Sequence, residues 1–153
     1  MHKALAGACL VFSGAAYAVT PGAYSFVERE LQPGTDEKTT LRCVSAEQVD
    51  ANGYLVPQKT LATHPSCQIS EDKTSGQARS WTAVCAGGAQ YKVTQKNSGK
   101  DFELDVKMEL SGTEIHTHFK GEALGRACTA GGAASGLTWP VLRSALTRGA
   151  MRA

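Results

Sequence analysis

Residues 101–110 read DFELDVKMEL and decide the fold class. Apolar side chains take every second position of this segment, and charged side chains take the positions between them. Successive side chains of a β-strand point to opposite faces, so the pattern predicts a strand with one buried and one solvated face. The side chains expected to point inward are Phe102, Leu104, Val106, Met108 and Leu110.

A second strand is expected after Ser111-Gly112, because this pair favours a tight hairpin turn. A two-residue loop at this point places Met108 opposite Ile115 on the buried face. On the solvated face it places Asp105 beside His118, which is a favourable cross-strand pair. Both faces therefore agree on one register.

The strand that precedes residue 101 is expected to turn at Ser98-Gly99. This loop predicts Val93 opposite Leu104 on the buried face. It also predicts Lys92 opposite Asp105 on the solvated face, again a pair of opposite charge. Three consecutive strands then form an antiparallel meander.

Two more strands are expected over residues 23–32 and 38–44, joined by the turn cluster Pro33-Gly34-Thr35-Asp36. Ser45 and Gln48 then have the spacing of a capping box, which predicts a short helical turn. With a further hairpin around the central cysteines, the sequence predicts an all-β fold. The expected form is a curved antiparallel meander, or a barrel-like sheet, of about seven strands braced by two disulfides.

The N-terminal segment has the three parts of a secretory signal peptide. Basic residues precede an uncharged run over residues 4–16, and the run ends at Ala16-Tyr17-Ala18. Cleavage is therefore expected after Ala18, with residues 1–18 and Cys9 discarded and the mature protein in the periplasm. A retained membrane anchor is the alternative, although the run is short and rich in Gly and Ala for a span of about 20 residues.

The cysteines left after cleavage favour two disulfides, because their number is even and exported thiols are oxidised. The segment between Cys67 and Cys85 is expected to form a hairpin with Ser75-Gly76-Gln77 as its loop, which sets these two cysteines opposite each other. Cys43 is then left for Cys128. Zinc is the competing interpretation, but the close Cys-x2-4-Cys pairs of zinc sites are missing from the sequence.

Length and charge narrow the class of protein. The 153 residues suit one domain, expected over residues 19–128 and followed by a flexible tail, residues 129–153, with a short helix in the tail as the alternative. The chain has 16 Lys and Arg against 14 Asp and Glu. This balance argues against a nucleic-acid partner, which would require a concentrated basic face.

A metal site is suggested by Glu114, His116 and His118, which alternate onto one strand face. A His-x-His strand can present two imidazoles to zinc or copper. The alternative is a solvated face on which the histidines pair with Asp105. His64 is distant in the sequence and adjoins a proline, so it is only a remote candidate for a further ligand.

A ligand cavity is suggested by four aromatic residues that fall on inward positions if the sheet curls. These residues are Trp81, Tyr91, Phe102 and Phe119. The alternative is plain core packing, and a third alternative is that an exposed strand edge takes a partner peptide. The sequence contains no Gly-x-Ser-x-Gly elbow and no other arrangement of an activated nucleophile, so no catalytic residue is expected.

Several landmarks are distributed along the expected domain. They are Pro21-Gly22-Ala23-Tyr24, Arg42-Cys43-Val44-Ser45-Ala46-Glu47-Gln48, Cys67, residues 81–85, and Leu124-Gly125-Arg126-Ala127-Cys128. With them the chain, from Pro21 to Cys128, resembles a bacterial periplasmic family known as domain of unknown function 3617. The resemblance implies a secreted, β-rich single domain and supplies no catalytic residues. The long tail departs from the family pattern, which leaves the role of the tail open.

These patterns together predict an exported binding or envelope-associated interaction protein, without catalysis and without a cofactor. Its expected partner is a small apolar ligand or an envelope protein. Zinc or copper binding through the His-x-His strand is the alternative function.

Overall fold

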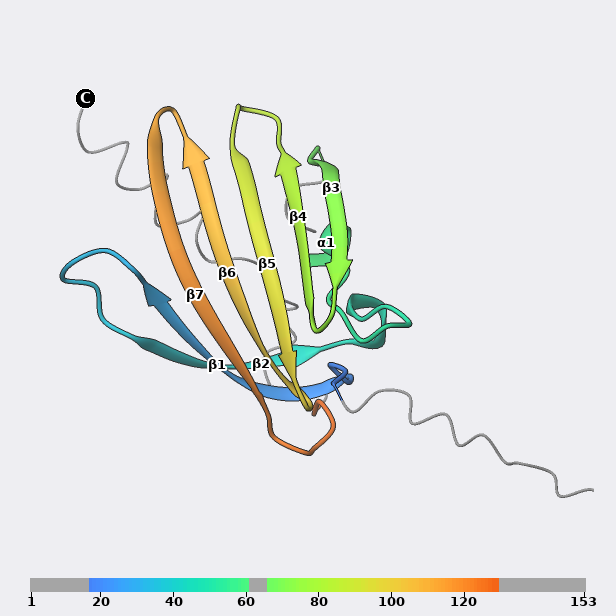
Figure 1. The fold of residues 1–153 in the computed structure, drawn as a ribbon. Coiled ribbons are helices and arrows are strands. Elements are labelled where there is room, and N and C mark those ends of the chain that lie inside the picture. Colours follow the sequence, from blue (N-terminus) through green and yellow to red (C-terminus); the bar gives the residue numbers. More distant parts are fainter. Residues whose placement is uncertain (1–16, 61–65, 130–153) are drawn as a thin grey trace, which may run out of the picture.

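The computed structural model describes residues 17–60 and 66–129. Figure 1 shows one antiparallel sheet with the strand order β2-β1-β7-β6-β5-β4-β3. The strands are β1 (Gly22–Glu30), β2 (Lys38–Val44), β3 (Gln68–Ser75), β4 (Ala78–Val84), β5 (Gln90–Ser98), β6 (Asp101–Leu110) and β7 (Thr113–Ala123). The prediction of an all-β fold with about seven strands is confirmed.

Strands β3 to β7 form an up-and-down meander, and the β1–β2 hairpin joins the sheet beside β7. Figure 1 shows β1 and β2 running at a steep angle to β4 and β5, so the sheet bends strongly. Strands β2 and β3 remain as the two edges of the sheet. No helix in the described ranges is long and apolar enough to cross a bilayer.

The β6–β7 hairpin has the predicted register. Met108 lies opposite Ile115, and Asp105 lies opposite His118. Ser111 and Gly112 form the turn with φ values of 52° and 77°. Two central residues with positive φ are the requirement of a type I′ turn, whose twist matches that of the flanking strands.

The predicted register of the β5–β6 hairpin is wrong by two residues. Val93 lies opposite Val106 instead of Leu104, and Lys92 lies opposite Lys107 instead of Asp105. The turn is Gly99-Lys100, in which only the glycine has a positive φ, 63°. A glycine at the first central position favours a type II′ turn, which is as compact as the predicted Ser98-Gly99 loop.

The β3–β4 hairpin differs from the prediction at its loop and agrees with it near the cysteines. Gly76-Gln77 forms a two-residue turn, where a three-residue loop was expected. A β-bulge compensates for the missing residue, because Glu71 and Asp72 together face Trp81 between the pairs at Ser70 and Lys73. Beyond the bulge the pairing brings Cys67 to Cys85.

Two disulfides close the fold as predicted. Cys43 bonds to Cys128, with their Cα atoms 5.6 Å apart, and ties edge strand β2 to the chain that follows β7. Cys67 bonds to Cys85 beside the β3–β4 hairpin. The bonds therefore fasten both edges of the sheet.

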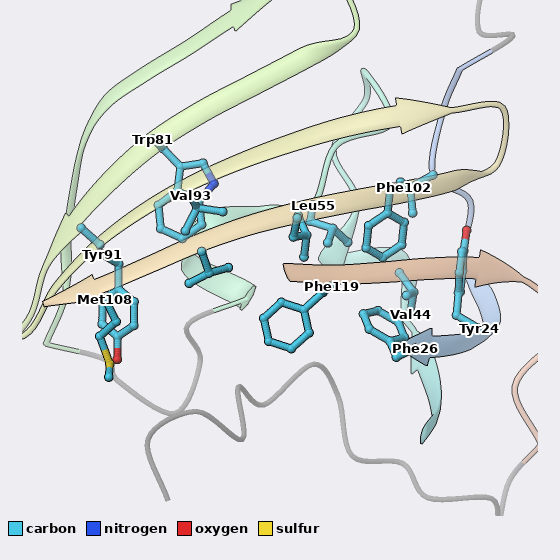
Figure 2. Packing of buried hydrophobic residues seen from close by; sticks show 14 of the residues in the cluster. Tyr24, Phe26, Val44, Leu55, Trp81, Tyr91, Val93, Phe102, Met108 and Phe119 are labelled. Atoms are coloured by element: carbon cyan, nitrogen blue, oxygen red, sulfur yellow. The ribbon is translucent and has the colours of Figure 1, made fainter. Parts of the chain in front are cut away.

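The core lies on one side of the sheet, which we call the inner face (Figure 2). Tyr24, Phe26 and Phe102 pack against one another there, with ring centroids 5.4–6.4 Å apart. The loop between β2 and β3 contributes Leu55, which is 2% exposed. The predicted helical turn in this loop is confirmed as the 3₁₀ turn η1 (Ala46–Gln48), in which Gln48 Oε1 accepts a hydrogen bond from Ser45 N–H. A one-turn helix, α1 (Pro57–Thr60), follows.

Some predictions concern residues outside the described ranges. They are the signal peptide apart from Tyr17 and Ala18, residues 130–153 of the tail, and His64. These remain predictions.

Candidate functional site

The four aromatic residues predicted to line a cavity all lie on the inner face (Figure 2). They come from β4, β5, β6 and β7 and are Trp81, Tyr91, Phe102 and Phe119. Each side chain is buried, with at most 5% of the residue exposed. The structure thus brings the predicted residues onto one surface, where they also belong to the apolar cluster. Their role as ligand contacts remains a prediction.

Two hydroxyl groups on the same face have no hydrogen-bond partner among the described residues. They are Tyr91 Oη and Thr117 Oγ1, and both atoms are buried. Tyr91 on β5 lies opposite Met108, and Thr117 on β7 lies opposite Val106, so the two residues belong to neighbouring rows of the sheet with β6 between them. Burial raises the pKa of Tyr91 to about 12. Thr117 lies two positions after Ile115, so alternation predicts that it points inward as well, but the sequence carries no signal that its hydroxyl lacks a partner.

The predicted histidine pair lies on the opposite side of the sheet, the outer face. His118 Nδ1 is 3.1 Å from Asp105 Oδ1, and His116 Nε2 is 3.7 Å from the same oxygen. Both imidazoles are about one-third exposed. The expected pairing of these histidines with Asp105 is therefore present.

Glu114 does not join this cluster, because it lies opposite Glu109, one row farther along the face. In residues 17–60 and 66–129, no three His, Cys, Asp or Glu side chains gather closely enough to hold a metal ion. His116 Nε2 is nevertheless a buried atom without a hydrogen bond in this part of the chain. The metal site remains a prediction.

A hollow on the outer face was not predicted. It has a volume of about 370 Å³ and lies over β3 to β7. Its lining includes Lys92, Lys107, Glu109 and Glu114. The register predicted for β5 and β6 placed Lys92 opposite Asp105, whereas the structure places it opposite Lys107. The sequence therefore did not predict two lysines side by side at this point.

A loop is anchored to the inner face by a chain of buried amides. Gln95 Oε1 accepts a hydrogen bond from Leu55 N–H at 3.0 Å, and Gln95 Nε2 donates to Asn97 Oδ1 at 2.7 Å. Asn97 Nδ2 donates to the Gly53 carbonyl at 2.9 Å. These bonds satisfy polar groups that would otherwise be costly to bury, and they fix Leu55 over the aromatic residues.

Arg79 fastens the start of the same loop. Its guanidinium donates two hydrogen bonds to Asp72, at 2.8 and 2.7 Å, and one to Asp50 Oδ2 at 2.6 Å. The hydrogen bonds from Arg79 lower the pKa of Asp72. The loop is therefore held by charged groups at its start and by neutral amides over the core.

Comparison with known proteins identifies a family. No curated protein and no solved structure matches the chain significantly. The sequence model of a family described as "Protein of unknown function (DUF3617)" matches residues 19–128. That span contains all the strands of the sheet, both disulfides and both candidate surfaces. The resemblance found in the sequence is thereby confirmed, and the chain belongs to the DUF3617 family of proteins of unknown function.

Proposed function

We propose that the protein is an exported, non-catalytic binding module whose inner face takes an apolar ligand that carries one polar group. One observation supports this proposal more than any other. Tyr91 Oη and Thr117 Oγ1 are buried on this face without a hydrogen-bond partner in the described part of the chain. Native proteins rarely leave buried polar groups unpaired, and each such group costs about 1–3 kcal/mol.

The surroundings of the two hydroxyls suit a ligand of this kind. Aromatic and aliphatic side chains cover the face, as in most small-molecule sites, where a few polar groups fix the orientation. Met108 lies beside Tyr91 (Figure 2), and its unbranched thioether adapts to different shapes. A ligand hydroxyl or carbonyl group beside Tyr91 or Thr117 would accept or donate a missing hydrogen bond.

Native mass spectrometry of the protein purified from its own periplasm tests the proposal. We expect an extra mass that disappears on denaturation and belongs to an apolar molecule with a hydroxyl or carbonyl group. Tyr91→Phe and Thr117→Val should each reduce the bound fraction while leaving the free energy of unfolding of the ligand-free protein equal or higher, because each removes an unpaired buried hydroxyl. Thr94→Val, on the outer face of β5, serves as the control and should retain the extra mass.

A bare mass for the wild-type protein, or full retention of the ligand by both inner-face variants, would contradict the proposal. A ligand that is lost in Thr94→Val as well would place the site elsewhere.

Export to the periplasm is part of the same proposal. It rests on the signal-peptide pattern of residues 1–18 and on two disulfides, which persist in oxidising compartments. The intact mass of the periplasmic protein should correspond to a chain that starts at Val19. A mass that includes residues 1–18 would refute cleavage at this point.

Metal binding is a second candidate function, supported by the two imidazoles that face Asp105 Oδ1. His116 Nε2 lacks a hydrogen bond in the described chain and has a lone pair to offer in one tautomer. Zinc or copper should then survive dialysis and raise the unfolding temperature of the wild type but not of a His116→Ala, His118→Ala double variant. An unfolding temperature that is insensitive to both metals would eliminate this candidate.

A further inference from the structure

The hollow on the outer face holds two like-charged pairs side by side. Lys92 of β5 lies directly opposite Lys107 of β6, and Glu109 of β6 lies directly opposite Glu114 of β7. None of the four side chains forms an ion pair or a side-chain hydrogen bond with another described residue. Like charges directly opposite each other destabilise a sheet.

This arrangement is confined to the hollow. Farther along the same face, Glu103 lies between Lys96 of β5 and Lys120 of β7, so the signs alternate across the three strands. The same strands therefore carry complementary pairs outside the hollow and repelling pairs within it. Repulsion that is retained at one place in an otherwise complementary face indicates a role other than stability.

The wall of the hollow on the β3 side contains a second unusual feature. Glu71 adopts a φ of 51°, a left-handed conformation that side chains other than glycine rarely take. It belongs to the β-bulge opposite Trp81, and bulges are common beside binding sites, where they redirect a side chain. Next to it, the hydroxyls of Ser70 and Thr82 lie 2.8 Å apart and also line the hollow.

We propose that the hollow binds a short zwitterionic peptide about the size of a dipeptide. The carboxylate of the peptide lies between Lys92 and Lys107, and its ammonium group lies between Glu109 and Glu114. Lys107 and Glu109 are two positions apart on one strand, so the two charged pairs are separated by about 7 Å. This is comparable to the distance between the charged ends of an extended dipeptide.

The size of the hollow is consistent with this ligand. Its 370 Å³ lies at the lower end of the range for small-molecule sites, which is roughly 300–1,000 Å³. The ligand also explains the retained repulsion, because each of its charged ends would lie between two side chains of the opposite sign and offset their mutual repulsion. The four charged residues of this site lie on the outer face, and the site does not depend on the function proposed for the inner face.

Titration of the full chain with the dipeptide Ala-Ala, followed by backbone amide NMR shifts, tests the inference. We expect saturable shifts on β5, β6 and β7 around the four charged residues. Lys107→Gln and Glu114→Gln should each weaken binding by roughly tenfold, because each removes one charge-assisted contact. Lys96→Gln is the matched control and should bind Ala-Ala like the wild type, since Lys96 lies outside the hollow.

Two further measurements separate this site from a general charge effect. Blocking one end of the peptide, as in N-acetyl-Ala-Ala or Ala-Ala amide, should weaken binding to a similar extent. Lys107→Gln should also raise the free energy of unfolding of the ligand-free protein, because it relieves the repulsion from Lys92.

Absence of saturable shifts at millimolar Ala-Ala would overturn the inference. So would equal binding of the free and blocked peptides, or equal weakening by Lys96→Gln and Lys107→Gln. Thr117→Val, on the inner face and outside the hollow, should leave Ala-Ala binding unchanged, so failure at this site is distinguishable from failure at the inner face.

Discussion

At the scale of single residues, Gly121 shows how closely the inner face is packed. Gly121 lies opposite Phe102 across β6 and β7, and a Cβ atom added to it would lie 2.6 Å from Phe102 Cζ. No real Cβ atom tolerates this distance, so either the ring or the strand must move. We expect Gly121→Ala to lower the free energy of unfolding by about 1–3 kcal/mol, measured by urea denaturation.

The same substitution in a Phe102→Leu background provides the control. Leucine removes the ring atoms that lie over Gly121, so the alanine should cost clearly less there than in the wild type. Equal costs in both backgrounds would mean that the Phe102 ring is not the obstacle.

Tyr91 makes the stability of the protein depend on alkaline pH. Burial raises its pKa to about 12 in the folded protein, whereas an unfolded tyrosine titrates near pH 10. The folded state thus holds the phenolic proton more tightly, and this contribution to stability is complete below about pH 10 and is lost between about pH 10 and 12. Urea unfolding across this range should show a steeper decline for the wild type than for Tyr91→Phe. Parallel curves would indicate that Tyr91 is not buried in solution.

At the scale of elements, the amide chain from Gln95 makes the loop over the core part of the sheet. Gln95→Ala would leave Leu55 N–H and Asn97 Oδ1 without their partners in a buried region. We expect a loss of about 2 kcal/mol or more in the free energy of unfolding. Hydrogen exchange of Leu55 N–H should also accelerate.

Gln90→Ala is the matched control, because Gln90 lies on the same strand but is exposed on the outer face. It should change the free energy of unfolding by less than about 0.5 kcal/mol. Similar losses in the two variants would show that the hydrogen bonds of Gln95 do not hold the loop.

Strand pairing also shows what the sequence can and cannot predict. Alternation identified which side chains of β5, β6 and β7 point inward, because that pattern depends on each strand alone. Registers that differ by two residues keep every side chain on its face, so alternation cannot choose between Val106 and Leu104 as the partner of Val93. The choice depends on the turn conformation at Gly99, and two compact turns were equally consistent with the local sequence.

The same inability of alternation to fix the strand register determined which parts of the candidate sites could be predicted. The inward aromatic residues and the pairing of Asp105 with His118 were predictable from alternation and from a correct β6–β7 turn. The opposed lysines of the hollow were not, because a two-residue error gave Lys92 an acidic partner. Nor does the sequence indicate that Thr117 Oγ1 lacks a partner, since this depends on every group that reaches the inner face.

At the scale of the whole molecule, alternation could not predict which strand the β1–β2 hairpin pairs with, although the predicted Cys43–Cys128 bond already brought the hairpin near the end of β7. Strand β1 pairs with β7, which is the last of the described strands along the chain, although more than 80 residues separate Arg29 from His118. This long-range pairing leaves β2 as an edge strand with β1 as its only partner in the sheet. The Cys43–Cys128 bond supplies the second attachment of that edge.

The two disulfides should therefore contribute unequally. In the chain-entropy account, a bond stabilises the fold by restricting the unfolded chain, and the effect grows with the length of the loop that it closes. Cys43–Cys128 spans 85 positions and Cys67–Cys85 spans 18, which correspond to about 4.6 and about 3.2 kcal/mol. The first bond also holds edge strand β2, whereas the second reinforces a hairpin that already pairs locally.

We expect a Cys43→Ala, Cys128→Ala variant to lose more stability than a Cys67→Ala, Cys85→Ala variant, measured by urea unfolding at neutral pH. Hydrogen exchange should locate the difference. The amides of β2 that hydrogen-bond to β1 should lose protection only when the Cys43–Cys128 bond is removed. Equal losses, or a larger loss from the shorter loop, would mean that local strain or residual structure in the unfolded chain outweighs loop entropy. The protection of β2 would then have to come from its pairing with β1 and not from the covalent bond.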